Sequence, residues 1–485
     1  MNNEHLLQSL LEHYCSQNLY PMHMPGHKRR VAPAPGLPYR WDVTEVPGTD
    51  DLHDAHDILA QAMARTAALW GSRRCWYLVG GSTCGILAGI RALAPAGSEV
   101  VAARNCHKSV YHAIELGGLT AHWVAPPVDR SFNIYGSVPP GAIARALNEH
   151  PNVRCVIVTS PTYEGVLSDL PMIARICHDH RVPLLVDEAH GAHLGLFPDW
   201  DGGALAAGAD VVVQSPHKTL PSLTQTALLH WNGDLADPDE LERQLDVFET
   251  SSPSYPLMAS LDGCTGLLQN RGRELFAAWT EWLNRFDRRA FDLRHLRVLC
   301  CGGDTVSAHR EIYRHDRSKL LVSTRQTGFT APRLAETLRE QCGFETEMTC
   351  GENVLAMSSP CDGTALDRFA TALLALDRVA GISTAAEPVT LPEPGPTLCT
   401  IAQALALRAR AKTVPLAEAA GYAAAEYLWA YPPGVPLVAP GEQISLNAVR
   451  ACAALEAAGT RLRHTGSKTA DTLLVLEPGM LPAKA

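Results

Sequence analysis

The chain has 485 residues, of which 46% are hydrophobic and 19% charged, and its formal net charge is -10. This composition is that of a globular protein, and the length predicts more than one domain. The acidic balance argues against a nucleic-acid partner, and no apolar run approaches the roughly 18 residues that a membrane span needs, so no membrane partner is expected. The first residues lack the pattern of a secretory signal, and the 14 cysteines include no C-x-x-C pair. We therefore expect reduced thiols in a cytoplasmic protein.

Short apolar runs alternate with helical patterns between residues 75 and 231. The expected strands are Cys75–Val79, Glu99–Ala102, Thr120–Val124, Arg154–Thr159, Pro183–Asp187, Asp210–Gln214 and Thr226–Trp231. The expected helices between them are Thr83–Leu93, Lys108–Gly117, Gly141–Glu149 and Leu170–His180. This alternation predicts an α/β fold with a large, mainly parallel sheet between helices. Ligands of such sheets bind beyond the carboxyl ends of the strands.

The second half is less regular and predicts a smaller α+β part. Pro388–Pro396 is the best linker candidate, Ala402–Ala430 has the composition of a helix, and the prolines of Tyr431–Pro436 require an extended segment. The predicted organisation is an arm over residues 1–35, a large sheet domain over 36–290, a small α/β domain over 291–390 and a C-terminal domain over 391–485.

A glycine turn follows the first expected strand and opens a helix. In Gly80–Gly85, the backbone N–H groups of Ser82, Thr83 and Cys84 would lie at the helix N-terminus, where free donors and the helix dipole bind phosphate. A plain turn with a Ser/Thr cap explains this motif equally well. The spacing matches neither the dinucleotide fingerprint nor the P-loop.

Two further strands end in charged residues. Asp187 closes one strand and precedes Glu188-Ala189-His190, and Lys218 lies in Ser215–Thr219 after another. A lysine beside a buried strand is costly unless it is paired or covalently used, as in Schiff-base chemistry. Lysine, carboxylate and phosphate-binding turn together are the fixtures of a pyridoxal-phosphate site. The histidines lack H-E-x-x-H spacing, so no metal is expected.

Several longer segments carry a family resemblance. They are Pro21–Lys28, Gly48–His53, Gly81–Gly85, Arg104–Ser109, Thr159–Gly165, Asp187–His190, Ser215–Lys218, Thr250–Pro256, Tyr431–Pro436 and Pro440–Glu442. Together they resemble the short bacterial branch of the Orn/Lys/Arg decarboxylase family of fold-type I pyridoxal-phosphate enzymes, over most of the chain.

The resemblance implies roles for individual residues. Lys218 is similar to the Schiff-base lysine, Asp187 to the carboxylate that keeps the pyridine nitrogen protonated, and His107 to the imidazole stacked on the cofactor ring. Ala189 would lie against the opposite ring face, and His190 stands where some relatives have an aromatic residue. The implied phosphate ligands are Ser82, Thr83, Ser215 and His217, with the backbone of Cys84.

The implied reaction removes CO2 from lysine, arginine or ornithine and leaves a di- or polyamine, with Lys218 or His217 returning a proton to Cα. The residues that bind the substrate's cationic side chain stay open among Asp50, Asp51, Glu164, Glu347 and Glu442. Transamination or amine oxidation on the same scaffold, and a non-catalytic homologue, are the alternatives. A homodimer or higher homo-oligomer is expected, in which Ser252 reaches the partner's cofactor.

Overall fold

The computed structural model describes residues 6–17, 19–29, 32, 34, 36–381, 393–430, 435–457, 462–467, 469 and 471–481. These residues form two compact units: Met1–Leu93, Pro183–Thr280 and Ser359–Cys361 make the first, and Ala94–Val182, Glu281–Ser358 and Asp362–Ala485 the second. Residues 388–392 of the expected linker and 431–434 of the proline motif lie outside the described residues. The four-part division predicted from the sequence stays a prediction.

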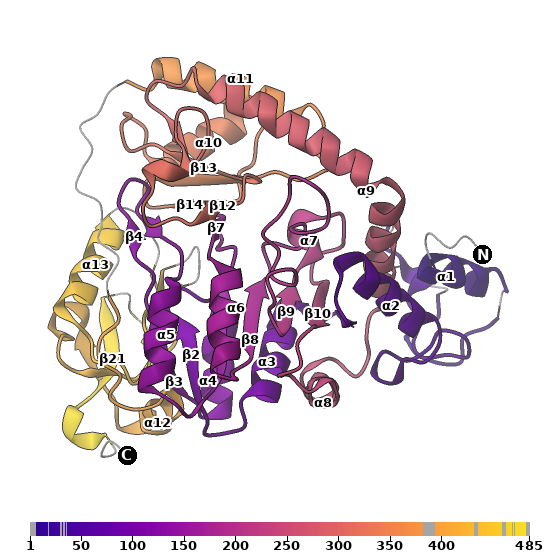
Figure 1. The fold of residues 1–485 in the computed structure, drawn as a ribbon, viewed down its shortest axis with the longest axis horizontal. Helices are drawn as coiled ribbons and strands as arrows, with labels where there is room; N and C mark the ends of the chain where they lie inside the picture. The colour runs from indigo at the N-terminus through magenta and orange to yellow at the C-terminus, as the bar shows by residue number, and fades with distance from the viewer. Residues whose placement is uncertain are drawn as a thin grey trace. The chain divides into compact units, whose positions relative to one another are not determined.

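The first unit combines helices with four neighbouring strands (Figure 1). Its helices are α1 (Leu6–Ser16), α2 (Ile58–Trp70), α3 (Gly81–Leu93), α7 (Pro216–Thr219), α8 (Pro238–Phe248) and most of α9 (Tyr255–Ala290). Its strands are β1 (Arg74–Leu78), β8 (Leu184–Glu188), β9 (Val211–Gln214) and β10 (Ala227–Trp231). Each strand lies within two residues of the predicted range, because an apolar run between polar segments marks a buried strand.

The strands of the first unit follow the order β1-β10-β9-β8. β8 and β9 are parallel, but β10 is antiparallel to both β9 and β1. The sequence predicted a mainly parallel sheet, and β10 is an antiparallel member of it. The two antiparallel pairings reverse direction twice, and β1, β9 and β8 therefore all run the same way.

Close packing of α3 depends on two glycines. A Cβ on Gly85 would lie 2.6 Å from Leu78 Cδ1 on β1, and one on Gly89 would lie 2.8 Å from Leu185 Cδ1 on β8. Only a residue without a side chain lets the helix come this near to the strands. α3 therefore packs directly against β1 and β8, two of the strands whose ends form the candidate site.

The second unit contains the remaining elements. Its helices are α4 (Lys108–Gly117), α5 (Pro140–Glu149), α6 (Leu170–Asp179), α10 (Ala331–Cys342), α11 (Ala365–Val379), α12 (Ile401–Ala406) and α13 (Leu446–Ala457). Its longer strands are β2 (Glu99–Ala103), β3 (Thr120–Val124), β6 (Val153–Thr159), β13 (Lys319–Ser323), β15 (Asn353–Met357), β16 (Lys412–Pro415), β19 (Val435–Val438) and β21 (Thr472–Leu476).

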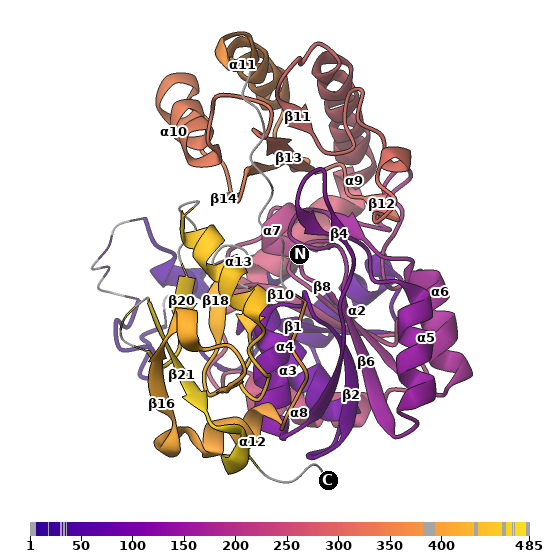
Figure 2. The ribbon, with the colours of Figure 1, turned by 90° about the vertical axis from the view of Figure 1, so that its left-hand side faces the viewer.

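The longer strands of the second unit pair in several groups. β6, β2 and β3 are parallel neighbours, as predicted. A second, antiparallel sheet has the order β11 (Arg297–Val298), β13, β15 and β14 (Met348–Cys350), and Figure 2 shows α10 and α11 beside it. The remaining short strands pair as β4 (Val128–Asp129) with β5 (Ile134–Tyr135) and β7 (Val166–Leu167) with β12 (Arg314–His315).

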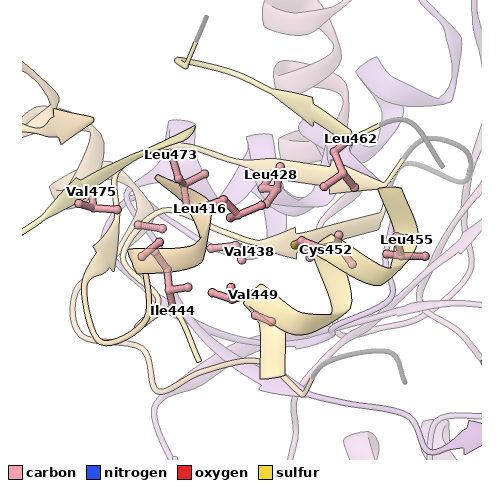
Figure 3. Close-up of a cluster of buried hydrophobic side chains, with 14 residues drawn as sticks. Leu416, Leu428, Val438, Ile444, Val449, Cys452, Leu455, Leu462, Leu473 and Val475 are labelled. Carbon is pink, nitrogen blue, oxygen red and sulfur yellow. The ribbon is translucent and has the colours of Figure 1, made fainter. Parts of the chain in front are cut away.

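The end of the chain has its own core. Two three-stranded sheets, β16-β21-β17 (with β17 Ala423–Ala424) and β19-β18-β20 (with β18 Leu428–Ala430 and β20 Leu462–His464), contribute to it together with α13. Figure 3 shows Leu428, Val438, Cys452 and Leu473 converging there. The helix predicted for Ala402–Ala430 is wrong beyond Ala406, because these strands bury the alanines between neighbours. Packing against partners distant in sequence outweighed the helix propensity of alanine.

Candidate functional site

Three strand ends of the first unit meet at one edge of its sheet. β1, β8 and β9 run in the same direction, so their carboxyl ends lie side by side with only β10 intervening. β1 leads into α3, β8 ends in Asp187 and Glu188, and β9 leads into α7 with Lys218. The three features that predicted a pyridoxal-phosphate site therefore lie at a common edge.

The turn between β1 and α3 has the geometry of an anion site. Gly81 begins α3 with φ at 78°, a backbone conformation that favours glycine. Ser82 is half-buried and Thr83 is exposed, so the first turn of the helix is open to a ligand. Its N–H groups have no acceptor within the helix, as at every helix start. Cys84 is buried, and its Sγ lies 3.0 Å from Gly81 O.

Glu249 braces this turn, and the sequence analysis missed it. Its Oε2 accepts the backbone N–H groups of Val79 and Gly80, both at 3.0 Å, and the thiol of Cys84 at 3.1 Å. A Cβ on Gly80 would lie 2.8 Å from Glu249 Oε1, so a larger residue at position 80 would require this carboxylate to move. The only sequence signal was its place next to the Thr250–Pro256 motif. Burial, followed by the nearby Glu249 charge, raises the pKa of the Cys84 thiol.

Lys218 and Asp187 form the charged centre of the site. Lys218 is half-buried, and its Nζ lies 3.0 Å from His190 Nε2. Asp187 is buried, and its Oδ1 accepts the N–H of Ala189 at 3.2 Å. Burial raises the pKa of Asp187, while the positive charge of Lys218 and the Ala189 N–H oppose that rise. The lysine is thus the cation that compensates a desolvated carboxylate.

Ser215 and His217 flank the lysine. Ser215 is fully buried, and its Oγ has no hydrogen-bond partner among the described residues. A buried hydroxyl in that state is costly, unless a ligand satisfies it. His217 Nδ1 donates to Thr226 O at 2.6 Å. Burial and the Lys218 charge lower the pKa of His217, against that hydrogen bond, so the neutral imidazole is favoured.

Two of the segments that carry the family resemblance contact each other in the structure. Tyr255 donates its hydroxyl to Asp50 O at 2.6 Å, and His53 Nε2 donates to Thr250 O at 2.8 Å. The Gly48–His53 and Thr250–Pro256 segments therefore form one structural element, although about 200 residues separate them. Ser252 is an exposed residue of this element, and its expected contact with a partner's cofactor stays a prediction.

His107 belongs to the second unit. It is the N-cap of α4, where its Nδ1 accepts the N–H of Ser109 at 3.3 Å and lies 2.9 Å from Ser109 Oγ. The imidazole therefore has a structural role as a helix cap. Its role as a ring-stacking residue stays a prediction.

The acidic residues considered for substrate binding differ in how far they are already engaged. Asp50 accepts four backbone N–H groups and Asp51 caps a short 3-10 helix, so both have structural roles. Glu442 forms an ion pair with Arg104 at 3.0 Å. Glu347 accepts the hydroxyl of Tyr163. Glu164 is buried, and burial raises its pKa.

Two clusters of described residues have the composition of metal ligands: Glu99, His122 and His150, and Cys300, Asp304 and His309. In the first cluster, the rings of His122 and His150 stack with their centroids 3.4 Å apart at 12°. In the second, both nitrogens of His309 contact carboxylates, at 2.8 and 2.7 Å. No helix of the described residues is long and apolar enough to cross a membrane.

Comparison with known sequences assigns the chain. Residues 6–365 match the family described as Orn/Lys/Arg decarboxylase, major domain, and residues 389–463 match its C-terminal domain. The chain belongs to the Orn/Lys/Arg decarboxylase family. This result confirms the predicted family and its assignment to the amino-acid decarboxylases.

Relatives of the decarboxylase match it along nearly its full length. It is 31% identical over 446 residues to an arginine decarboxylase of Bacillus subtilis (strain 168), with 90% of each chain covered. It is 29% identical over 474 residues to an arginine decarboxylase of Halalkalibacterium halodurans, with 96% of each chain covered.

Solved structures confirm the predicted α/β, fold-type I architecture. A lysine decarboxylase of Francisella novicida superposes with a TM-score of 0.81 at 18% identity, covering 97% of this chain and 80% of that one. A ureidoglycine-glyoxylate aminotransferase of Bacillus subtilis gives a TM-score of 0.53 at 15% identity, covering 67% of this chain and 86% of that one. At these identities the likeness shows the fold alone.

Proposed function

We propose that this decarboxylase uses pyridoxal phosphate to remove the α-carboxyl group of a basic amino acid, releasing CO2 and the corresponding amine. The observation that carries the proposal is the common edge of β1, β8 and β9, where a helix N-terminus, a buried carboxylate and a lysine come together. The named arginine decarboxylases of Bacillus subtilis and Halalkalibacterium halodurans support arginine as the first substrate to test.

The residues present fit the cofactor. The buried Ser215 hydroxyl has no hydrogen-bond partner among the described residues and can donate to a phosphate oxygen. The N–H groups of Ser82, Thr83 and Cys84 are at the start of α3, where the helix dipole favours an anion. Ala189 is small and buried, so it leaves room for a flat ring. His190 lies against the lysine and completes the set of proposed cofactor contacts.

Each polar residue then has a chemical role. When bound, pyridoxal phosphate supplies the electron sink for the bond that breaks at Cα. Asp187 would hold a proton on the pyridine nitrogen. Because Asp187 is buried, the attraction between its carboxylate and a positively charged ring nitrogen would be strong. Lys218 anchors the cofactor and, with His217, is the candidate for returning a proton to Cα. His107 is proposed to stack on the ring.

The test measures CO2 and amine from arginine, lysine, ornithine and a neutral amino acid, with the cofactor-loaded protein. Lys218→Ala should remove the visible absorbance of the loaded protein. Asp187→Ala should retain some bound cofactor but lose nearly all turnover. Unchanged absorbance and turnover in Lys218→Ala would refute the assignment. A keto acid or aldehyde product would instead indicate transamination or oxidation, and a wild type without absorbance would indicate a non-catalytic homologue.

We further propose that the decarboxylase is cytoplasmic and acts as a homodimer or higher homo-oligomer. The exposed Ser252, in an element that links two family motifs, supports a contribution to a neighbouring subunit's site. A sedimentation measurement of the loaded enzyme tests the assembly, and a monomer at assay concentration would contradict it.

A further inference from the structure

A chain of buried polar side chains crosses the first unit directly beside the site. Glu188 is fully buried, and its Oε2 accepts a hydrogen bond from Gln214 Nε2 at 2.7 Å. Gln214 Oε1 lies 3.2 Å from His230 Nε2, and His230 Nδ1 lies 2.9 Å from Ser72 Oγ. The other Glu188 oxygen accepts the N–H of Ala204 at 2.8 Å. No role proposed so far uses this chain.

The donors and acceptors of the chain run in one direction. The Gln214 amide donates to Glu188, so its oxygen must accept from His230. His230 therefore carries its proton on Nε2, and its Nδ1 accepts from the Ser72 hydroxyl. Burial lowers the pKa of His230 to about 3, so it stays neutral, as this arrangement requires. A fully satisfied buried network of this kind holds one arrangement of its strands.

The position of the Glu188–Gln214 hydrogen bond matters most. Glu188 and Gln214 are opposite each other in the last pair of the β8–β9 register, where both strands leave the sheet. Asp187 directly precedes Glu188, and Lys218 follows Gln214 by four residues. Backbone pairing between β8 and β9 stops at this point, and the side-chain hydrogen bond adds a direct link between the two strand ends.

We propose that Glu188 and Gln214 form a clamp that sets the separation of Asp187 and Lys218, with His230 orienting the Gln214 amide. These three are positioning residues, and the proposal rests on the proposed function, because that function gives the separation its importance. Misplacement of reacting groups by about 1 Å can reduce turnover on the order of 100-fold. The clamp is thus expected to affect kcat far more than KM.

Gln214→Glu tests the clamp by placing two carboxyl groups where an amide now meets the carboxyl group of Glu188, whose pKa burial raises to about 8. Two acids at this distance cannot both ionise, so the variant is penalised increasingly as the pH rises. We expect kcat at pH 8 to fall on the order of 100-fold, and the pH titration of the visible absorbance to shift. If this variant does not fold, Gln214→Met is measured in its place, since it also removes the amide.

The double variant Glu188→Gln with Gln214→Glu exchanges donor and acceptor. The amide at position 188 still accepts from Ala204 and now donates to the carboxylate at position 214, which also accepts from His230. All hydrogen bonds of the chain are retained, so kcat and the absorbance titration should return to wild-type values. Rescue by exchange is expected only if the hydrogen bond itself is what matters.

Asp210→Asn is the matched control. Asp210 is buried, and its Oδ2 accepts the N–H of Leu184 at 2.8 Å, at the opposite end of the same β8–β9 pair. The control should lower thermal stability and leave the absorbance titration unchanged. The proposal is overturned if the control shifts the titration as Gln214→Glu does. It is equally overturned by a wild-type kcat and titration in the position-214 variant, or by an exchange variant that folds without recovering either.

A final readout separates this proposal from the proposed function. A wild type that gains no visible absorbance with pyridoxal phosphate refutes the proposed function. In that event the unloaded protein is treated with trinitrobenzenesulfonate, and the modification rate of Lys218 is followed by peptide mapping. A rate that differs between wild type and Gln214→Glu, and recovers in the exchange variant, supports the clamp. An equal rate overturns it.

Discussion

The buried ion pair between Arg104 and Glu442 yields a quantitative prediction. Both residues belong to the second unit, and they are only 2% and 3% exposed. Arg104 Nη2 donates to Glu442 Oε2 at 3.0 Å, and the same oxygen accepts the N–H of Ala439 at 3.0 Å. The guanidinium also donates to the hydroxyl of Tyr111 and to Pro436 O at 2.9 Å. We therefore expect Glu442 to stabilise the second unit rather than to bind a substrate cation.

Removing the carboxylate leaves the guanidinium buried without its charge partner. Breaking a buried pair in this way costs about 3–5 kcal/mol, so Glu442→Ala should lower the free energy of unfolding by that amount. Glu442→Gln keeps an acceptor for Arg104 and for Ala439 but loses the charge. Since hydrogen bonds to charged groups contribute about 1.5–3 kcal/mol, a loss near the lower end of that range is expected for this variant.

Urea unfolding of wild type and both variants measures these losses, and steady-state kinetics on basic amino acids provides the functional comparison. We expect KM to change little in Glu442→Gln. The double variant Arg104→Met with Glu442→Ala should be more stable than Glu442→Ala alone, because it no longer buries an unpaired charge. A loss below about 1 kcal/mol in Glu442→Ala would contradict the buried-pair reasoning. A large rise in KM with unchanged stability in Glu442→Gln would instead indicate that Glu442 binds the substrate.

Two other positions allow simpler tests. Gly85→Ala would place a Cβ 2.6 Å from Leu78 Cδ1, so α3 must shift; overpacking of this kind costs about 1–3 kcal/mol, and titration with pyridoxal phosphate should also show weaker binding. Unchanged stability and affinity would contradict the close packing. The pKa of His309 is raised against the lowering effect of burial by hydrogen bonds to Asp129 and Asp304. The charged His309 side chain should therefore stabilise the folded protein fully below about pH 6.5. This stabilisation should be lost as the pH rises through the pKa of His309 in the folded state. Chemical unfolding should show a gap between wild type and His309→Gln that narrows from pH 6 to pH 9, and a constant gap would refute the charge assignment.

Local patterns were sufficient for much of the fold. The run Leu184–Glu188 is a strand because three apolar residues precede the two carboxylates, and the structure begins and ends β8 within a residue of the prediction. The two glycines before Ser82 predicted the start of a helix, and α3 begins at Gly81. Such signals need only neighbouring residues, since strand periodicity and helix starts depend on a few consecutive backbone conformations. Alanine content alone was misleading, as Ala423 and Ala424 form a strand.

Local sequence patterns did not predict the residues that hold the site in position. Glu249 binds the turn at Gly80 across 169 residues, and Gln214 meets Glu188 across 26. In the sequence alone, Glu249 is an acidic residue next to a motif and Gln214 is an amide at the end of a strand. The sequence by itself predicted which residues carry the chemistry, because lysine, carboxylate and glycine turn follow recognisable strand patterns. Only the tertiary structure decided what holds them in place, because strand order and register bring together side chains that no local pattern connects.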